Sequence, residues 1–549
     1  MPQGNSWIDY VILALYAVSM IGVAVYTKNR SGSVNDFLLA GKKGLNGWMT
    51  AFAYGTTYFS AVVFIGYAGQ FGRAFGLASV WIGIGNAVLG TLIAWLVLAG
   101  RTKNMTRRLN SKTMPDFFEK RYGSKKLKFV SAVIIFIFLI PYSASVYNGL
   151  SSLFEIVYGI PGWVVMVALA LLTAVYLFFG GYFATALSDF IQGIIMLIGV
   201  ALMVICYLNH PNVGWNISEL WNDPMLTWHT FGHADQGFFG STVSLISLTL
   251  LTSLGVWALP QTVHKYYAIR DKKAISQGVV VSTAFALVIG ATAYFSGALS
   301  PLFGSIEAIA NASDAQVIPQ MLKIVIPVGL TGVIAVLILS ASMSTLSSVS
   351  LAGASVMAVD LYKGGINKNA SDKRVNIVMR VLCLAFVVIS VVLAILNEEL
   401  QLTAIAYMMG LSWGTLAGCF IGPFVLGLLW KRVTKPAVWT SIISSLVLTV
   451  ALLFILGYAH PACDGSLGSA LKMGVSCSPT IGVICMLFSL ASTALVSLFT
   501  KRPSDEVLYE AFDKPIEDEI GSIFDNKKLP AASEAVAEAE DVSVKDEIK

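Results

Sequence analysis

The chain has 549 residues, of which 56% are hydrophobic and only 12% are charged, and its formal net charge is +5. Soluble proteins carry about a quarter charged residues, so this composition excludes an ordinary soluble protein and predicts a polytopic protein of the lipid bilayer. The charge pattern gives no basis for nucleic-acid binding.

Apolar runs long enough to cross a bilayer recur along the chain. A crossing helix needs about 20 mostly apolar residues. The N-terminal flank of the first run lacks the basic residues of a cleaved signal peptide. We predict an all-α fold with thirteen transmembrane helices near residues 9–27, 47–72, 77–99, 129–155, 162–180, 187–207, 238–264, 275–299, 329–358, 375–396, 401–430, 437–458 and 479–500.

Basic residues lie in alternate connections between these predicted spans. Residues 101–128 hold ten Lys and Arg, whereas residues 209–238 hold none. Cytoplasmic connections are enriched in Lys and Arg. We therefore expect a multi-pass protein of the plasma membrane, with its N-terminus outside and its C-terminus in the cytoplasm. Cys463 and Cys477 bracket one outer connection, and the sequence leaves open whether they form a disulfide.

The end of the chain differs in composition from the rest. Residues 501–549 contain 14 acidic and 7 basic residues. Acidic segments of this kind rarely bury enough apolar surface to fold. We expect a transmembrane domain over residues 1–500 and an acidic, poorly ordered cytoplasmic tail over residues 501–549.

Two predicted spans contain residues that weaken a helix. The span at 47–72 has Gly55 followed by two threonines, and the span at 238–264 contains Gly255 and Pro260. Gly and β-branched residues lower helix stability, and Pro removes a backbone donor. An unwound segment in mid-membrane exposes carbonyl oxygens that can bind an ion or a solute. An intact helix with a small-residue packing face is the competing interpretation.

The two interrupted spans are five spans apart. A transporter built from two five-helix repeats of opposite orientation would place them in this way. We therefore predict a five-plus-five inverted repeat, with core repeats over about residues 45–207 and 238–430.

The predicted spans hold no acidic or basic residue near their midplane. Proton-coupled carriers usually place a titratable side chain there. No His, Cys and Asp set has the spacing of a metal or catalytic site, and no GxxxxGK[ST] loop occurs. We expect neither an enzyme nor an ATP-driven pump, and no cofactor apart from a coupling ion.

Hydroxyl groups crowd the span at 329–358. Seven of the eleven residues from Ser340 to Ser350 are Ser or Thr. Hydroxyl and carbonyl oxygens can replace the water shell of a small cation. Ser344 and Thr345 are adjacent, and the Ala341 carbonyl lies one helical turn before Thr345. These groups form a candidate Na⁺ site, which the opened backbone of the 47–72 span would complete. Close helix packing through small residues is the competing interpretation.

Six motifs occur in a fixed order along the chain: DFLLAGKKGLNGW (36–48), VWIGIGNAVLGTLIAWLVLAGRTK (80–103), TMPDFFEKRYGSKKLK (113–128), FFGGYFATALSDFIQG (178–193), SMSTLSS (342–348) and GLLWKRVTKPAV (427–438). With them, residues 8–500 resemble the sodium/solute symporters, which include the sodium/proline and sodium/pantothenate carriers. The resemblance implies a LeuT-like inverted-repeat core, Na⁺ as coupling ion and a small-molecule substrate.

The resemblance also implies particular sodium ligands. Carried over by motif, they are the carbonyls of Thr56, Phe59 and Ala341 and the hydroxyls of Ser344 and Thr345. Asp189 corresponds to a waypoint for Na⁺ near the cytoplasmic exit. The other serines of the hydroxyl-rich span are expected only to allow close packing; they are Ser340, Ser342, Ser347, Ser348 and Ser350.

For the solute the resemblance is less specific. Tyr58 stands where proline carriers have an Asp, and the run TTYFS is more similar to pantothenate carriers. Val63 and Val80 are apolar where sugar carriers have Gln and Glu, which argues against a sugar. The candidate substrate contacts are Tyr58, Tyr142, Trp257 and Pro260. For the aromatic residues, packing or an interfacial role is an equally open interpretation.

These features together predict a sodium-coupled symporter that imports a small organic solute. The expected solute is a carboxylate such as pantothenate, proline or another amino or organic acid. The alternatives are proton-coupled or uncoupled transport on the same fold, a different solute such as a sugar, a channel, and a transporter-like sensor acting through a partner. The sequence leaves the solute, the Na⁺ stoichiometry and the oligomeric state open.

Overall fold

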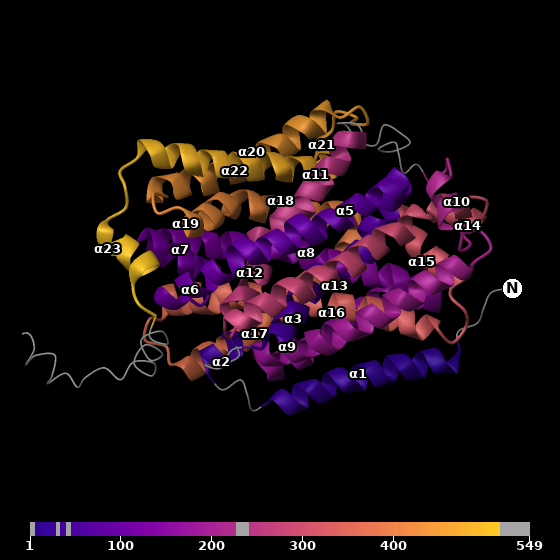
Figure 1. Cartoon of the computed structure of the whole chain (residues 1–549), viewed down its shortest axis with the longest axis horizontal. Coiled ribbons are helices and arrows are strands. Elements are labelled where there is room, and N and C mark those ends of the chain that lie inside the picture. Colours follow the sequence, from indigo (N-terminus) through magenta and orange to yellow (C-terminus); the bar gives the residue numbers. More distant parts are fainter. Residues whose placement is uncertain (1–5, 29–32, 40–44, 227–240, 401, 517–549) are drawn as a thin grey trace, which may run out of the picture.

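The computed structural model describes residues 6–28, 33–39, 45–226, 241–400 and 402–516. Within these ranges the secondary structure is helical, apart from a backbone bridge between Leu45 and Ile269. The long helices run side by side along the long axis of the molecule (Figure 1). The expected all-α architecture is therefore confirmed for the described residues.

The helices fall into two series along the chain. The first series comprises α1 (Trp7–Thr27), α2 (Val34–Leu39), α3 (Gly47–Tyr58), η2 (Val62–Gly72), α4 (Arg73–Phe75), η3 (Gly76–Ser79), α5 (Val80–Gly85), η4 (Asn86–Ile93), η5 (Trp95–Ala99), α6 (Gly100–Arg108), α7 (Met114–Tyr122), α8 (Lys125–Tyr158), α9 (Gly162–Asn209) and α10 (Ile217–Asn222).

The second series comprises α11 (Ser241–Leu254), η6 (Gly255–Trp257), α12 (Pro260–Tyr267), α13 (Lys272–Ala298), η7 (Ser300–Phe303), α14 (Glu307–Ala310), α15 (Asp314–Val325), α16 (Thr331–Ser355), η8 (Val356–Ile366), α17 (Asp372–Leu400), α18 (Ile405–Ile421), η9 (Gly422–Leu426), α19 (Gly427–Leu429), α20 (Lys435–Ala459), α21 (Leu467–Ser476), α22 (Ser478–Phe499), α23 (Asp505–Leu508) and η10 (Tyr509–Asp513).

By length and composition, ten helices of the described chain are apolar enough to cross a membrane, or eleven if one bent pair counts as a span. Two of them, Val62–Arg108 and Gly162–Asn209, have 47 and 48 residues. One crossing needs only about 20 residues. The membrane-spanning character is confirmed, whereas the number thirteen stays a prediction.

Helix α9 covers two of the predicted spans, 162–180 and 187–207. Gly181 divides it, with φ 60° and ψ −162° inside an otherwise helical run. A side chain at this position would be strained at this φ and would meet the Phe37 ring at 2.9 Å. The connection between the two predicted spans is therefore a sharp kink rather than a loop.

Both helix interruptions predicted from the sequence are present. Helix α3 ends at Tyr58 and helix η2 begins at Val62, so the backbone at Phe59 and Ser60 is not helical. Farther along, the helical run Thr242–Trp257 bends by 40° before α12. Pro260 is the first residue of α12, where its missing N–H costs nothing. Residues 238–240, at the start of the second expected repeat, lie outside the described residues.

Helix α16 lies in the middle of the bundle and packs against α8 and α9. All residues from Ile334 to Ser355 are buried. In Figure 1 it lies between α9 and α13. A hydroxyl-rich helix that is buried on every side must satisfy its polar groups within the protein.

The segment after the last long helix is partly ordered, against the expectation of a poorly ordered tail from residue 501. Helices α23 and η10 pack against α7 and α6, respectively. Ala511 and Leu508 are buried there. The remainder of the expected tail, residues 517–549, lies outside the described residues. Cys463 and Cys477 are both free thiols.

Candidate functional site

The site is built on the break between α3 and η2. Phe59, which ends α3, has φ −106° and ψ 120°, an extended conformation. No described residue donates a hydrogen bond to its carbonyl. The chain re-enters a helix after Ser60, whose side-chain oxygen accepts a hydrogen bond from the Val62 N–H. The break thus leaves carbonyl oxygens at the end of α3 without their usual helical donors.

Hydroxyl groups of α16 face these carbonyls. Ser344 Oγ donates to the Thr56 carbonyl at 3.0 Å, and Thr345 Oγ1 donates to the Thr57 carbonyl at 3.3 Å. Both hydroxyls also lie close to the Ala341 carbonyl, at 3.0 and 3.1 Å. Five oxygen atoms from two helices are therefore linked by four contacts of 3.0–3.3 Å.

Four of the five expected sodium ligands belong to this oxygen cluster: Thr56, Ala341, Ser344 and Thr345. The fifth, Phe59, lies in the break itself, at the C-terminal end of α3. The Thr57 carbonyl is an addition that the motifs did not indicate. A set of neutral carbonyl and hydroxyl oxygens suits a small hard cation such as Na⁺.

Two serines that were expected only to allow packing make specific contacts across the break. Ser342 Oγ accepts a hydrogen bond from the Ala61 N–H at 3.2 Å, so α16 satisfies a backbone donor at the start of the resumed helix. Ser348 Oγ lies 2.9 Å from Thr57 Oγ1. Ser342 and Ser348 therefore also make hydrogen-bonding contacts, in addition to the close packing that was expected of them. The helical period and the residue composition could not distinguish Ser342 and Ser348 from the neighbouring serines. The position of the partner helix determines which serine contacts a hydrogen-bond donor.

Asp189 is not a free carboxylate. Its Oδ2 lies 3.2 Å from Nζ of Lys265, and both side chains are almost completely buried. Lys265 directly follows the predicted span 238–264, but it lies on α12 inside the protein. No signal in the sequence indicated this pair, because the course of α12 beyond Pro260 places Lys265 inside the bundle.

Two of the four expected substrate contacts lie in one aromatic cluster. The rings of Tyr58 and Tyr142 approach the same indole, that of Trp413 on α18, at 6.1 and 5.5 Å between centroids. Tyr58 donates its hydroxyl hydrogen to the Thr252 carbonyl. Among the described residues, no group is within hydrogen-bonding geometry of the buried Tyr142 hydroxyl. Trp413 was missed from the sequence, where it is one of twelve tryptophans.

The other two expected contacts make different interactions. Trp257 donates its indole N–H to the Leu89 carbonyl at 2.9 Å. Pro260 lines a separate small cavity together with Thr113 and His264. The structure therefore groups Tyr58 and Tyr142 around Trp413 and does not place Pro260 with them.

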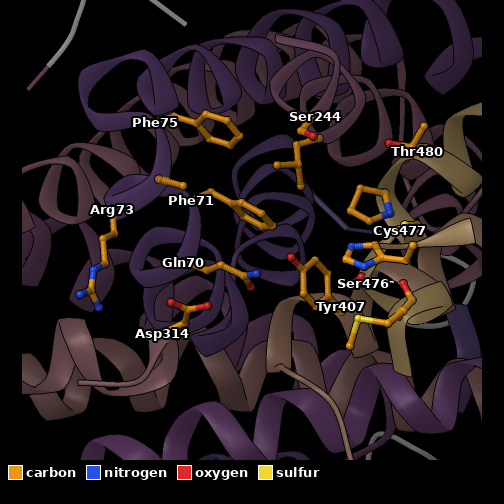
Figure 2. Close-up of a pocket in the computed structure, with 15 residues that line it drawn as sticks. Gln70, Phe71, Arg73, Phe75, Ser244, Asp314, Tyr407, Ser476, Cys477 and Thr480 are labelled. Atoms are coloured by element: carbon orange, nitrogen blue, oxygen red, sulfur yellow. Dashed lines mark hydrogen bonds between the residues drawn. The ribbon is translucent and has the colours of Figure 1, made fainter. Parts of the chain in front are cut away.

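A cavity of about 560 Å³ opens at the far end of η2. We call it the Arg73 cavity. Figure 2 shows Arg73 and Asp314 on one side of it, opposite Cys477 and Thr480, with Tyr407 between them. The ring of Phe71 on η2 lies 6.3 Å from that of Tyr407. Tyr407 and Trp413 are both on α18, so the same helix lines this cavity and contributes Trp413 to the aromatic cluster.

The electrostatics of the Arg73 cavity are mixed. Burial raises the pKa of the Asp314 carboxyl above its ordinary value, and the nearby Arg73 guanidinium acts in the opposite direction. Arg73 itself donates hydrogen bonds to the carbonyls of Ala310 and Ala312. The cavity thus offers one group of each charge beside aromatic side chains.

Broken helices whose open backbone faces a hydroxyl-lined helix, within a bundle of membrane-crossing helices, are the architecture of secondary active transporters. The model of the sodium:solute symporter family matches residues 37–444. The chain belongs to the sodium:solute symporter family, and its activity is sodium-coupled solute symport.

Two curated bacterial transporters are similar in sequence to this chain. The osmoregulated proline transporter OpuE of Bacillus subtilis is 27% identical over 498 residues, which cover 90% of this chain and 95% of the relative. A sodium/proline symporter of Haemophilus influenzae is 28% identical over 435 residues, or 77% of this chain and 84% of the relative.

A solved structure has the same fold. A Na⁺-coupled sialic acid symporter in a substrate-bound outward-open state aligns with a TM-score of 0.73 and 18% sequence identity. The alignment covers 91% of this chain and 99% of that protein. At this identity the similarity concerns the fold alone.

Proposed function

We propose that Na⁺ binds in the oxygen cluster between the α3–η2 break and α16. The ligands are the carbonyls of Thr56, Phe59 and Ala341 and the hydroxyls of Ser344 and Thr345. One observation carries this assignment: Ser344 and Thr345 each lie 3.0–3.3 Å from a carbonyl oxygen at the end of α3. In the absence of a cation these hydroxyls donate to the carbonyls; with Na⁺ present, both kinds of oxygen can turn toward the ion.

The proposed solute is a small organic carboxylate, with proline or a related amino acid as the first candidate and pantothenate as the second. The names of the curated relatives support proline. The aromatic cluster of Tyr58, Tyr142 and Trp413 provides an apolar surface beside the break, and the unpartnered Tyr142 hydroxyl provides one polar group. This combination suits a small solute with an apolar ring or chain and one polar end.

The proposed topology has thirteen crossings, two inverted five-helix repeats over residues 45–207 and 238–430, an external N-terminus and a cytoplasmic C-terminus in the plasma membrane. The helices of 47 and 48 residues support it, because each is long enough for two crossings. In this topology the Arg73 cavity faces the outside, since the predicted outer connections 300–328 and 458–479 contribute to its lining. Asp189 and Lys265 then lie toward the cytoplasm.

Coupling follows from shared stabilisation of one state. Na⁺ joins α16 to the end of α3, and the proposed solute contacts Tyr58 at the same helix end. Each ligand therefore favours the arrangement that the other one needs, and the two affinities are linked reciprocally.

Transport by the purified chain in liposomes tests this function. We expect an inward Na⁺ gradient to drive accumulation of labelled proline, and an equal K⁺ gradient or a pH gradient in Na⁺-free buffer to give none. Accumulation driven by the pH gradient alone would overturn sodium coupling. Tight binding without net flux would instead support a sensor.

Thermal stabilisation in detergent identifies the solute. A true ligand pair stabilises the folded protein more when Na⁺ and solute are present together than the sum of the two separate effects. Proline, pantothenate and a sugar are screened in Na⁺ and in K⁺. Equal stabilisation by proline in the two salts would contradict the proposed shared site.

A further inference from the structure

A buried ion pair lies beside the proposed sodium site and is not part of it. Lys265 on α12 and Asp189 on α9 are separated by 3.2 Å between Nζ and Oδ2, and their side chains are 1% and 0% exposed. Charges are removed from water at high cost unless they are paired and hydrogen-bonded. A buried ammonium at this position therefore requires a charged partner and hydrogen-bonding neighbours.

Two further groups contact the Lys265 ammonium. Nζ donates to Ser348 Oγ at 2.8 Å and lies 5.2 Å from the centre of the Tyr182 ring. Ser348 Oγ in turn lies 2.9 Å from Thr57 Oγ1. The ammonium is thus connected to α9, α12, α16 and the end of α3, the same helix end that supplies the sodium-site carbonyls.

Thr57 links the ammonium to Thr345, one of the proposed sodium ligands. The carbonyl of Thr57 accepts from Thr345, whereas its hydroxyl meets Ser348. Ser348 follows Thr345 by three residues, which is about 5 Å along α16. The second carboxylate oxygen of Asp189, Oδ1, is buried and has no hydrogen-bond partner in the part of the chain that the structure describes. An ion that leaves the site past Ser348 therefore meets a carboxylate that is already neutralised by an internal cation.

We propose that the Lys265 ammonium, by pairing with Asp189, blocks the path by which Na⁺ passes from its site to the cytoplasm. Na⁺ reaches the cytoplasm by taking the place of the ammonium at this carboxylate, and the ammonium returns when the ion has left. The inference rests on the proposed sodium site one turn away. Lys265 is a positioning residue in this scheme: it sets the charge and the availability of Asp189 and is no sodium ligand.

Opposite shifts in Na⁺ dependence are expected from the two halves of the pair. Lys265→Met removes the ammonium and leaves a bare carboxylate near the path, which attracts Na⁺. Asp189→Asn leaves a bare ammonium there, which repels Na⁺. Since unlike charges a few ångströms apart interact strongly in a protein interior, we expect the half-saturating Na⁺ concentration to change by about tenfold or more, downward in the first variant and upward in the second.

The experiment measures sodium-driven solute uptake by the purified full chain in liposomes as a function of Na⁺ concentration. The variants are Lys265→Met, Asp189→Asn, the double variant with both changes, and Lys265→Arg. The double variant restores neutrality, so its half-saturating Na⁺ concentration is expected between those of the single variants. Lys265→Arg keeps the charge and is expected closer to wild type than Lys265→Met.

One control variant tests whether the effect is specific to the Lys265–Asp189 pair, and two results would contradict the proposal. Lys363→Met makes the same chemical change in a solvent-exposed ion pair with Asp372 and is expected to leave the Na⁺ dependence unmoved. If Lys265→Met does not fold, the comparison of Asp189→Asn with the double variant decides. Two results would show that the ion pair only stabilises the fold. One is an equal Na⁺ dependence in the two single variants. The other is a double variant whose half-saturating Na⁺ concentration is no closer to wild type than that of Asp189→Asn. Failure of the proposed function is distinguishable, because the wild type itself would then show no Na⁺ stimulation.

Discussion

The hydroxyl of Thr345 lies 3.3 Å from the carbonyl oxygen of Thr57, although 288 positions separate the two residues in the chain. One comes from the middle of a continuous helix, and the other from the end of a helix that stops in the interior of the protein. This contact brings a hydroxyl and an open carbonyl together, which are two kinds of oxygen that can bind a small cation.

Thr345→Ala removes one proposed oxygen ligand without adding bulk. We expect the half-saturating Na⁺ concentration for solute uptake to rise by about tenfold or more, which corresponds to a loss of about 1.4 kcal/mol or more in the free energy of Na⁺ binding. Thr345→Ser retains the hydroxyl and is expected to retain most of the affinity. Ser355→Ala is the control on the same helix, because its hydroxyl bonds only the Ala352 carbonyl of its own helix. Unchanged Na⁺ dependence in Thr345→Ala would remove this residue from the site.

Ser342→Ala leaves the Ala61 N–H without its partner in the interior. A buried unsatisfied donor costs about 1–3 kcal/mol, so we expect a lower thermal unfolding midpoint in detergent. Ser296→Ala deletes a buried hydroxyl that bonds its own helix and serves as the control. Equal midpoints for the two variants would mean that the contact between Ser342 and the resumed helix contributes nothing to stability.

The two tyrosines of the aromatic cluster are expected to respond differently to loss of their hydroxyls. Tyr142→Phe removes a hydroxyl without a partner, so the free energy of unfolding should stay the same or increase, while the KM for solute rises by about 2- to 10-fold. Tyr58→Phe removes the hydrogen bond to the Thr252 carbonyl and should lower stability by about 1 kcal/mol. Thermal unfolding and uptake kinetics of both variants give the comparison. A Tyr142→Phe protein with unchanged KM would argue that its hydroxyl does not face the solute.

Asp314 in the Arg73 cavity predicts a pH-dependent contribution to stability. Its pKa is raised in the folded protein by burial, against the opposing effect of Arg73. The folded state therefore binds more protons than the unfolded state, and this group stabilises the protein as pH falls from the folded pKa toward the unfolded value near 3.8. We expect the stability of wild type relative to Asp314→Asn to increase as pH falls through this interval in detergent. A relative stability that decreases over that interval would contradict the raised pKa.

Phe512 anchors the segment that follows the last long helix. Its ring lies 4.9 Å from the Arg121 guanidinium and 5.5 Å from Lys431 Nζ, and Lys431 also pairs with Asp513. We expect Phe512→Ala to lower stability by about 1–2 kcal/mol through lost packing and cation–π contacts.

Limited proteolysis should also cleave the segment around Phe512 faster in the variant. The exposed Tyr509 supplies the control Tyr509→Ala. Identical cleavage of both variants would indicate that the ring does not hold the segment.

Local features of the sequence were sufficient for much of the fold. Hydropathy identified the membrane helices, because each needs a long apolar run whatever its neighbours are. Gly55 and Pro260 pointed to the two broken helices, since their effects on the backbone act within a turn. The number of crossings was harder to predict, because the kink at Gly181 replaces a loop by a continuous helical run.

The functional site likewise has features that follow from the sequence and features that only the tertiary structure shows. By itself the sequence determined a membrane symporter, its hydroxyl-rich helix and the adjacent pair Ser344 and Thr345, because these depend on composition and on spacing along one helix. Only the tertiary structure decided that Ser342 and Ser348 meet the broken helix, that Trp413 joins the two tyrosines, and that Lys265 pairs with Asp189. Each of these contacts crosses between helices far apart in the chain. Their partners are therefore selected by the rotation and depth at which helices pack, which a single helix does not encode.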